Sequence, residues 1–181
     1  MKIGILGAGG IGSNVAVNLV RSGVSNLKIA DFDRIELSNL NRQFYFHDQI
    51  GRSKVEALKE NLERIAPDLD LEIIDEKIEK KNIKELFGDC DILVEAFDKK
   101  EYKKLLIEEF HSSNKLIVSA SGIAHHDLDD ISTKKFGDNI YVVGDFKKGI
   151  EEYKTYSPKV LIVASMMANI VMNEGGYYEK N

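Results

Sequence analysis

The chain has 181 residues and carries 25 lysine and arginine residues against 30 aspartate and glutamate residues, a formal net charge of −5. A chain of this length suits a single domain, because it can bury roughly 70% of the surface that it exposes when unfolded. We therefore expect one domain over residues 1–181. The acidic balance, with lysines spread along the chain rather than in a basic stripe, excludes nucleic acid as an expected partner.

The cysteine content and the N-terminus indicate the compartment. Cys90 is the single cysteine, so it cannot form an internal disulfide or a zinc site built on paired cysteines. No apolar run reaches the roughly 20 residues that span a bilayer, and no cleavage site follows the N-terminal sequence MKIGILGAGG. We expect a cytoplasmic protein that does not bind a membrane.

Short runs rich in β-branched residues alternate along the chain with segments of helical period. In chain order, the pattern predicts strand 2–6, helix 11–22, strand 27–32, helix 53–65, strand 71–74, helix 83–87, strand 91–97, helix 101–110 and strand 116–119. Repeated βα units with short connections imply right-handed crossovers. We therefore predict a doubly wound, mostly parallel, Rossmann-like α/β sheet with helices on both faces.

The last third of the chain is less regular. Residues 121–136 show no clear period and are predicted to form a loop at the rim of the sheet, followed by a late strand over residues 139–143. Ser157 is expected to cap a final helix over residues 159–173, with Pro158 at its first position. Because this helix is apolar nearly all round, we expect it to be buried in the core.

A glycine-rich turn follows the first predicted strand and opens the first helix. It consists of Gly7, Ala8, Gly9, Gly10, Ile11 and Gly12. Such glycines permit a tight turn, let the backbone approach a phosphate and leave room for the helix against the strand, while the helix N-terminus offers N–H groups to an anion. The turn indicates a nucleotide site, but by itself it does not separate NAD, FAD, ATP and S-adenosylmethionine.

The end of the second predicted strand carries two acids about 20 residues after the turn. Asp31 lies at the strand terminus, where an acid can bind ribose hydroxyls. Asp33 either joins Asp31 at the nucleotide or caps the following turn.

The segment after this strand is more specific. Residues 31–44 read DFDRIELSNLNRQF, and residues 51–55 read GRSKV. This pattern resembles the signature of the ubiquitin-activating-enzyme-like adenylyltransferases, the ThiF/MoeB/HesA family. The resemblance is strongest to ThiF-type proteins, and it implies ATP as nucleotide, a homodimer, and a small ubiquitin-like sulfur carrier such as ThiS of thiamine biosynthesis as partner.

The residue types of this segment suit adenylation. When a carboxylate attacks the α-phosphate of ATP, charge builds on phosphate oxygens and must be met by fixed cations. Arg42 can grip phosphate in a bidentate manner, and Lys54 supplies a point charge at a helix start. Asn39 and Gln43 are neutral donors that can orient oxygens.

The fourth predicted strand ends near Asp98. In the family that this chain resembles, the matching aspartate holds Mg²⁺, a cation that prefers carboxylate oxygens. The alternative is that Asp98 caps the following helix. Where that family has asparagine and arginine after the aspartate, this chain has Lys99 and Lys103. Paired CxxC zinc motifs and a cysteine after the fifth strand, both common in the family, are absent here, and we expect no helix before the first strand. We therefore expect no zinc.

We expect an adenylyltransferase that converts the carrier's C-terminal carboxylate into an acyl-adenylate. An NAD-dependent reductase and a non-catalytic nucleotide-binding partner subunit remain as alternatives. Cys90 precedes the fourth strand while Asp98 follows it, so on the order of 26 Å of extended chain separates them. Cys90 is therefore expected to be structural, and sulfur delivery is left to a separate donor.

Overall fold

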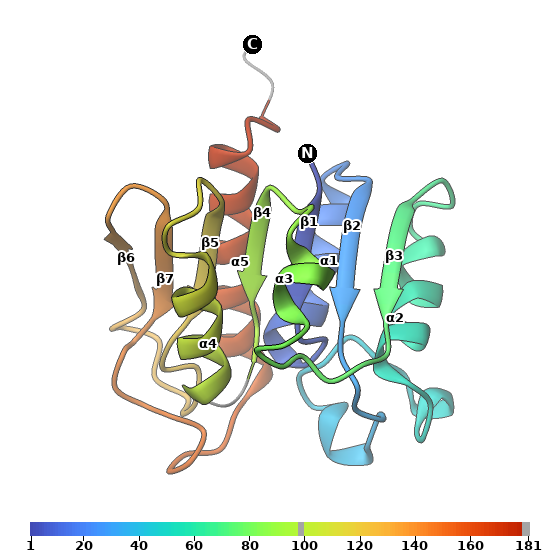
Figure 1. Cartoon of the computed structure of the whole chain (residues 1–181). Coiled ribbons are helices and arrows are strands. Elements are labelled where there is room, and N and C mark those ends of the chain that lie inside the picture. Colours follow the sequence, from blue (N-terminus) through green and yellow to red (C-terminus); the bar gives the residue numbers. More distant parts are fainter. Residues whose placement is uncertain (98–99, 179–181) are drawn as a thin grey trace.

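The structure, a computed structural model, describes residues 1–97 and 100–178 (Figure 1). Its sheet has seven strands in the order β3-β2-β1-β4-β5-β7-β6. The strands are β1 (Ile3–Leu6), β2 (Asn26–Ala30), β3 (Asp70–Ile74), β4 (Ile92–Glu95), β5 (Leu116–Ala120), β6 (Ser132–Phe136) and β7 (Ile140–Gly144). All neighbours pair in parallel except β6 and β7, which are antiparallel. The doubly wound, mostly parallel α/β fold is confirmed.

Helices cover both faces of this sheet. They are α1 (Gly10–Arg21), α2 (Lys54–Glu63), α3 (Ile83–Phe87), α4 (Lys100–Phe110) and α5 (Ser157–Glu174), with short 3-10 turns η1 (Leu37–Asn39) and η2 (His47–Gln49). Figure 1 shows α3 and α4 in front of the sheet, with α1, α2 and α5 behind it. Each face has its own apolar core, and α1 packs along α5.

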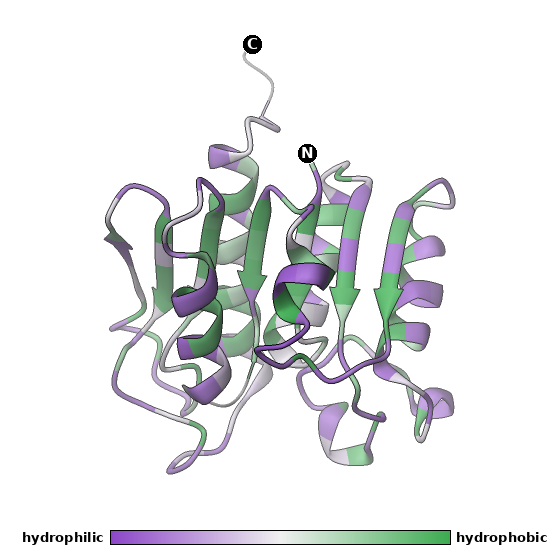
Figure 2. Ribbon diagram, in the orientation of Figure 1, coloured by the Kyte–Doolittle hydropathy of each residue, from purple (hydrophilic) through white to green (hydrophobic). Residues whose placement is uncertain are grey.

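The apolar pattern explains why these segments fold as layers. Figure 2 shows the central strands in green, whereas α2 and α4 are banded in green and purple. Central parallel strands are covered on both faces and are therefore mostly apolar. All residues of β1 and β4 are buried, and Glu95 at the end of β4 is the one charged residue among them. The helices need only one apolar stripe, because their outer faces meet water.

The strand order reverses between β1 and β4. The chain runs outward from β1 to β2 and β3, then returns to place β4 on the other side of β1. Loops that follow β1 and β4 therefore leave in opposite directions and open a crevice at the carboxyl ends of the strands. In open α/β sheets, ligands bind at this switch point.

Two predictions for the last third of the chain were wrong. Residues 121–136 are not one loop, because β6 occupies Ser132–Phe136 at the sheet edge. All its residues are exposed, so it lacks the apolar alternation by which strands are recognised. Ser157 does not cap the last helix: it is the first residue of α5, and Tyr156 takes the cap position without a side-chain hydrogen bond.

The last helix is also less buried than expected. One face of α5 packs on α1, β5 and β7, while Leu161 and Ile162 are 41% and 37% exposed on the other. The apolar composition thus reflects two surfaces, one inside the core and one facing outward. Among the described helices, none combines the length and the hydropathy needed to cross a bilayer.

Candidate functional site

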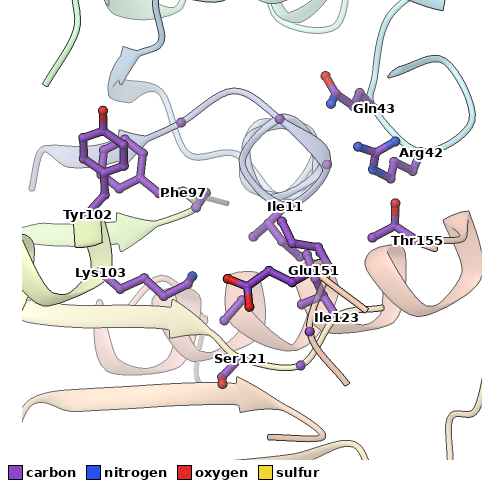
Figure 3. A pocket seen from close by; sticks show the side chains of 18 of the residues that line it. Ile11, Arg42, Gln43, Phe97, Tyr102, Lys103, Ser121, Ile123, Glu151 and Thr155 are labelled. Carbon is purple, nitrogen blue, oxygen red and sulfur yellow. The ribbon is translucent and has the colours of Figure 1, made fainter. Parts of the chain in front are cut away.

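A cavity of about 980 Å³ opens at the switch point between β1 and β4. Two walls enclose much of it (Figure 3). The glycine-turn wall is formed by Gly7, Gly9, Gly10, Ile11, Asp31, Phe32, Asp33, Asn41, Arg42, Gln43 and Lys54. The C-terminal wall is formed by residues 120–123, 146, 147 and 149–156, which follow β5 and β7. The two walls meet where Asn41 Nδ2 donates to the carbonyl oxygen of Thr155 at 3.4 Å.

Close packing makes two glycines of the turn obligatory. Gly7 has φ of 103°, and a Cβ on it would lie 2.8 Å from the carbonyl oxygen of Ala96. A Cβ on Gly12 would lie 1.8 Å from the carbonyl oxygen of Gly7. Gly12 does not line the pocket, and its role is to let α1 begin directly against the turn, as the spacing of the motif predicted.

The turn is held from two sides at Ala8. Asp31 accepts the Ala8 N–H at 2.7 Å, and the buried Tyr45 hydroxyl donates to the Ala8 carbonyl oxygen at 2.7 Å. Burial, together with the nearby carboxylates of Asp31 and Asp33, raises the pKa of Tyr45 well above its ordinary value, so it remains a donor. Asp31 lines the pocket at the end of β2, and its predicted contact with ribose stays a prediction.

The loop that carries Arg42 is tied to the first turn of α1. Asn14 Nδ2 donates to the carbonyl oxygens of Gly10 and Arg42 at 2.6 and 2.8 Å, and Ser13 Oγ accepts the Phe44 N–H at 3.0 Å. Arg42 Nη1 in turn donates to Asn41 Oδ1 at 2.8 Å. The guanidinium therefore enters the pocket from a fixed backbone. The sequence reasoning did not identify Asn14, whose partner lies 28 residues further along the chain.

Lys54 and Asp33 form an ion pair on the same wall. Lys54 Nζ lies 2.8 Å from Asp33 Oδ2, and the lysine side chain is 7% exposed while the aspartate is 52% exposed. The ammonium is thus held at the start of α2 with one side open to the pocket. Asp33 thus orients Lys54. From the sequence, Asp33 was expected either to contact the nucleotide or to cap the following turn, and the ion pair is a third role.

Asn39 and Gln43 are placed differently. Asn39 does not line the pocket: its side-chain oxygen accepts the Glu36 N–H at 3.0 Å, and its carbonyl oxygen accepts the N–H groups of Arg42 and Gln43. Gln43 lines the pocket and is 9% exposed. Within the residues that the structure describes, the buried Oε1 of Gln43 has no donor. Buried acceptors without a partner are rare, so this atom fits a ligand that brings a donor.

A buried carboxylate, that of Glu95, lies at the end of β4. Glu95 is 1% exposed and accepts hydrogen bonds from Ser119 Oγ, from the Phe97 N–H at 2.9 Å and from Lys103 Nζ at 2.9 Å. Lys103 therefore reaches the pocket as half of an ion pair. Asp98 and Lys99 lie outside the described residues.

The C-terminal wall is the part of the pocket that sequence reasoning identified least well. Of the predicted rim loop 121–136, the residues 121–123 line the cavity, and the larger contribution comes from residues 146–156 between β7 and α5. Gly149, Tyr153 and Tyr156 just before Pro158 were the available signal, since a glycine and aromatic residues at a strand end often mark a binding loop. Over residues 1–97 and 100–178, no group of three or more histidine, cysteine or acidic side chains is placed to hold a metal ion.

The fold and the site define a nucleotide-binding α/β protein, and comparison with known proteins gives its family. The model of the ThiF family matches residues 1–173. The chain belongs to the ThiF family, and the resemblance stated from its motifs is confirmed.

Individual relatives support this assignment over different lengths. Molybdopterin-synthase adenylyltransferase of Haemophilus influenzae is 32% identical over 123 residues, which is 67% of this chain and 51% of that protein. Ubiquitin-like modifier-activating enzyme 5 of Caenorhabditis elegans is 42% identical over 71 residues, 39% of this chain and 17% of that protein. The matched regions thus span about half of the first relative and less than a fifth of the second.

A solved structure extends the likeness to nearly the whole chain. The tRNA N6-threonylcarbamoyladenosine dehydratase TcdA of E. coli, in complex with AMP, superposes with a TM-score of 0.83 at 19% identity, covering 98% of this chain and 88% of that one. At this identity the likeness supports the fold.

Proposed function

We propose that this protein is an ATP-dependent adenylyltransferase that activates the C-terminal carboxylate of a small ubiquitin-like sulfur carrier protein. The observation that carries the proposal is the pairing of Arg42 and Lys54 with the glycine turn on one wall of the switch-point cavity. The relationship to molybdopterin-synthase adenylyltransferase supports the reaction type. Hydride transfer by an NAD-dependent reductase would not require the positive charges of Arg42 and Lys54 at this place.

The reaction needs little covalent chemistry from the protein. A carboxylate oxygen of the carrier attacks the α-phosphorus of ATP, the bond to the bridging oxygen breaks, and pyrophosphate leaves with that electron pair. Arg42 and Lys54 meet the charge that develops on the phosphate oxygens. Backbone N–H groups at the start of α1 receive a phosphate group, and Asp31 accepts from the ribose hydroxyls.

The pocket wall also fits the predicted cation. Mg²⁺ is held in such sites by one or two carboxylates together with substrate phosphates, and it neutralises phosphate charge. Asp31 and Asp33 already place carboxylates on the glycine-turn wall. We assign the principal carboxylate ligand to Asp98 by the resemblance of its position to the family motif.

Within this class we propose a ThiS-type carrier of thiamine biosynthesis, activated in the cytoplasm. The support is the ThiF-type loop of residues 31–44, and the carrier's tail would reach the α-phosphate along the C-terminal wall. Cys90 is 1% exposed, and burial, reinforced by Asp89, raises the pKa of its thiol to about 12. A neutral, buried thiol is a poor nucleophile, so sulfur comes from a separate donor.

We further propose that two copies pair through the outer face of α5. Residues 160–173 contain no charged side chain, and Leu161, Ile162, Met166 and Ile170 are exposed or half-buried on this helix. Because each chain has a net charge of −5, an uncharged face is where two copies meet with least repulsion. Ile162→Glu should give a monomer in sedimentation analysis, while Ile107→Glu on α4 should not.

Carrier-dependent exchange of labelled pyrophosphate into ATP tests the proposed function. Wild-type protein with Mg²⁺ and a purified ThiS-type carrier should exchange label, and a carrier lacking its last residue should not support exchange. If a different small carrier supports exchange, the enzyme is still a carrier adenylyltransferase, and that carrier takes the place of ThiS as the proposed substrate. Tight NADH binding without measurable ATP binding would favour the reductase, and ATP binding without exchange with any carrier would favour a non-catalytic subunit.

A further inference from the structure

A buried ion pair lies behind the C-terminal wall. Lys159, near the start of α5, is 0% exposed, and Asp145, directly after β7, is 4% exposed. Lys159 Nζ lies 2.6 Å from Asp145 Oδ2 and also donates to the carbonyl oxygen of Ala124 at 2.7 Å. One ammonium group therefore joins α5, the end of β7 and the loop after β5.

The other oxygen of Asp145 fixes the first residues of the wall. Asp145 Oδ1 accepts the N–H groups of Lys147 and Lys148 at 2.8 and 2.9 Å. The Asp145 N–H donates to the Gly122 carbonyl oxygen, and the Phe146 N–H donates to the Ser121 carbonyl oxygen. The two loops of the wall are thus locked to each other at their first residues.

The backbone at this point is unusual enough to need such a lock. Phe146 has φ of 61°, a conformation that a phenylalanine rarely adopts. A Cβ on Gly122 would lie 2.0 Å from Asp145 Oδ1, so the aspartate fills the space beside that glycine. Strained residues of this kind persist where surrounding contacts over-determine them, and they cluster at functional sites.

A buried ion pair is a weak source of stability, because the desolvation of both charges offsets their attraction. Apolar residues of similar volume in place of a buried ion pair often leave the stability unchanged or raise it. What the ion pair adds is a defined geometry, since the carboxylate must meet one ammonium and two backbone N–H groups at once.

The hydrogen bonds of the pair go to residues of the C-terminal wall and of the loop after β5, and none of them goes to the glycine-turn wall. Ser121 and Ile123 lie across the cavity from Arg42 and Gln43 (Figure 3). The glycine-turn wall has separate supports, namely Asp31, Tyr45 and Asn14. A change behind the C-terminal wall should therefore leave nucleotide binding intact.

We propose that Lys159 and Asp145 are positioning residues that hold the C-terminal wall in the shape that receives the carrier's tail. This inference rests on the proposed function, because the tail is what the wall would receive.

The test is the double variant Asp145→Asn/Lys159→Met, which removes both charges and leaves no buried ion unpaired. In pyrophosphate exchange with a ThiS-type carrier, the KM for the carrier should rise about tenfold or more, which corresponds to about 1.4 kcal/mol of lost binding free energy. The Kd for ATP in calorimetry should stay within about twofold. The matched control is Asp89→Asn/Lys28→Met, which makes the same pair of substitutions at the amino end of the sheet. In this control, the KM for the carrier and the Kd for ATP should both stay near their wild-type values.

Hydrogen–deuterium exchange provides a readout that needs no carrier. In the double variant, the N–H groups of Phe146, Lys147 and Lys148 should exchange at least about tenfold faster, while those of residues 7–12 stay unchanged. Unchanged exchange at residues 146–148 would overturn the inference even if the variant loses activity. If the wild-type protein is active and the double variant has the same KM for the carrier, the inference is overturned as well. If the wild type shows no carrier-dependent reaction, the proposed function fails and hydrogen exchange still decides whether the pair holds the wall.

Discussion

At the amino end of the sheet, Lys28 contacts Asp89 and Glu72, whereas at the carboxyl end Lys159 contacts Asp145. The lysines are buried to a similar degree, with side chains 6% and 0% exposed, but their partners differ. The side chains of Asp89 and Glu72 are 50% and 48% exposed and remain in contact with water, while the side chain of Asp145 is 2% exposed.

The difference lies in what each ion pair holds. Lys2 joins Lys28 on Glu72 and Asp89, so the amino end has a network of four charges on residues of, or next to, the strands. At the carboxyl end, ion pairs connect a strand end or loop to a helix: Lys54 to Asp33, Lys103 to Glu95 and Lys159 to Asp145. Charge at the amino end thus supports the fold, and charge at the carboxyl end supports the shape of a pocket.

The largest effect is expected from removing the charges that face phosphate. Arg42→Ala, Lys54→Ala and Asp98→Ala should each lower pyrophosphate exchange by about 100-fold or more, the scale of losing one preorganised charge partner. Arg42 lies in a loop and Lys54 at the first residue of α2, where its partner Asp33 is 52% exposed, so thermal unfolding of these two variants should change little. Arg52→Ala is the control, because Arg52 pairs with Glu60 outside the pocket. Exchange near the wild-type rate in all three variants would refute the assigned roles.

The next effect concerns the attachment of Arg42. Asn14→Ala removes two hydrogen bonds and leaves the Arg42 carbonyl oxygen without its side-chain donor. We expect the Kd for ATP to rise about tenfold, which corresponds to about 1.4 kcal/mol, the size of a lost buried hydrogen bond. Asn18→Ala is the matched control, since Asn18 Nδ2 donates to Asn14 one turn further along α1. Equal losses in both variants would mean that Asn14 acts only on the helix.

A smaller effect is expected at the amino end of the sheet, in the pH dependence of the free energy of unfolding. Burial alone would raise the pKa of Asp89, but hydrogen bonds from Lys2 and Lys28 hold it well below its ordinary value. A carboxylate with a lowered pKa in the folded state stabilises the fold above its unfolded pKa of about 3.9, and this contribution is lost as the pH falls. In acid titrations of the free energy of unfolding, Asp89→Asn should therefore lose less stability than wild type between about pH 5 and 2. Parallel titration curves would show that the network contributes nothing.

The smallest effect is expected at Cys90. This thiol lies before β4 at the amino end, its Sγ donates to Asp89 Oδ1, and Cys90 is not among the residues that line the pocket. Cys90→Ser should retain carrier adenylation and should leave the products formed with a sulfur donor unchanged. Mass spectrometry checks this directly. A thiol-sensitive covalent carrier adduct that disappears in Cys90→Ser would contradict this prediction, because it would show that Cys90 reacts with the carrier.

The sequence was sufficient for the features that rest on local pattern. Buried strands, amphipathic helices and the glycine turn depend on residues a few positions apart, and β1, α1 and the turn between them lie where they were predicted. Contacts such as Lys159 with Asp145, or Tyr45 with Ala8, depend on how distant segments meet, and no local period encodes them. The C-terminal wall escaped prediction for the same reason, because residues 146–156 reach the pocket only once β7 has paired with β5.

The outer edge of β6 has a consequence for solubility. An unpaired strand edge offers N–H and C=O groups to any other strand, and natural proteins block such edges with charge. β6 carries adjacent lysines at its centre, and each ammonium lies over a ring of this protein, Lys134 at 4.0 Å from the centroid of Phe146 and Lys135 at 5.0 Å from that of Tyr141. A second β6 approaching edge to edge would bring like charges together. The protein is thereby protected against stacking into fibres at this strand, even though its edge is open.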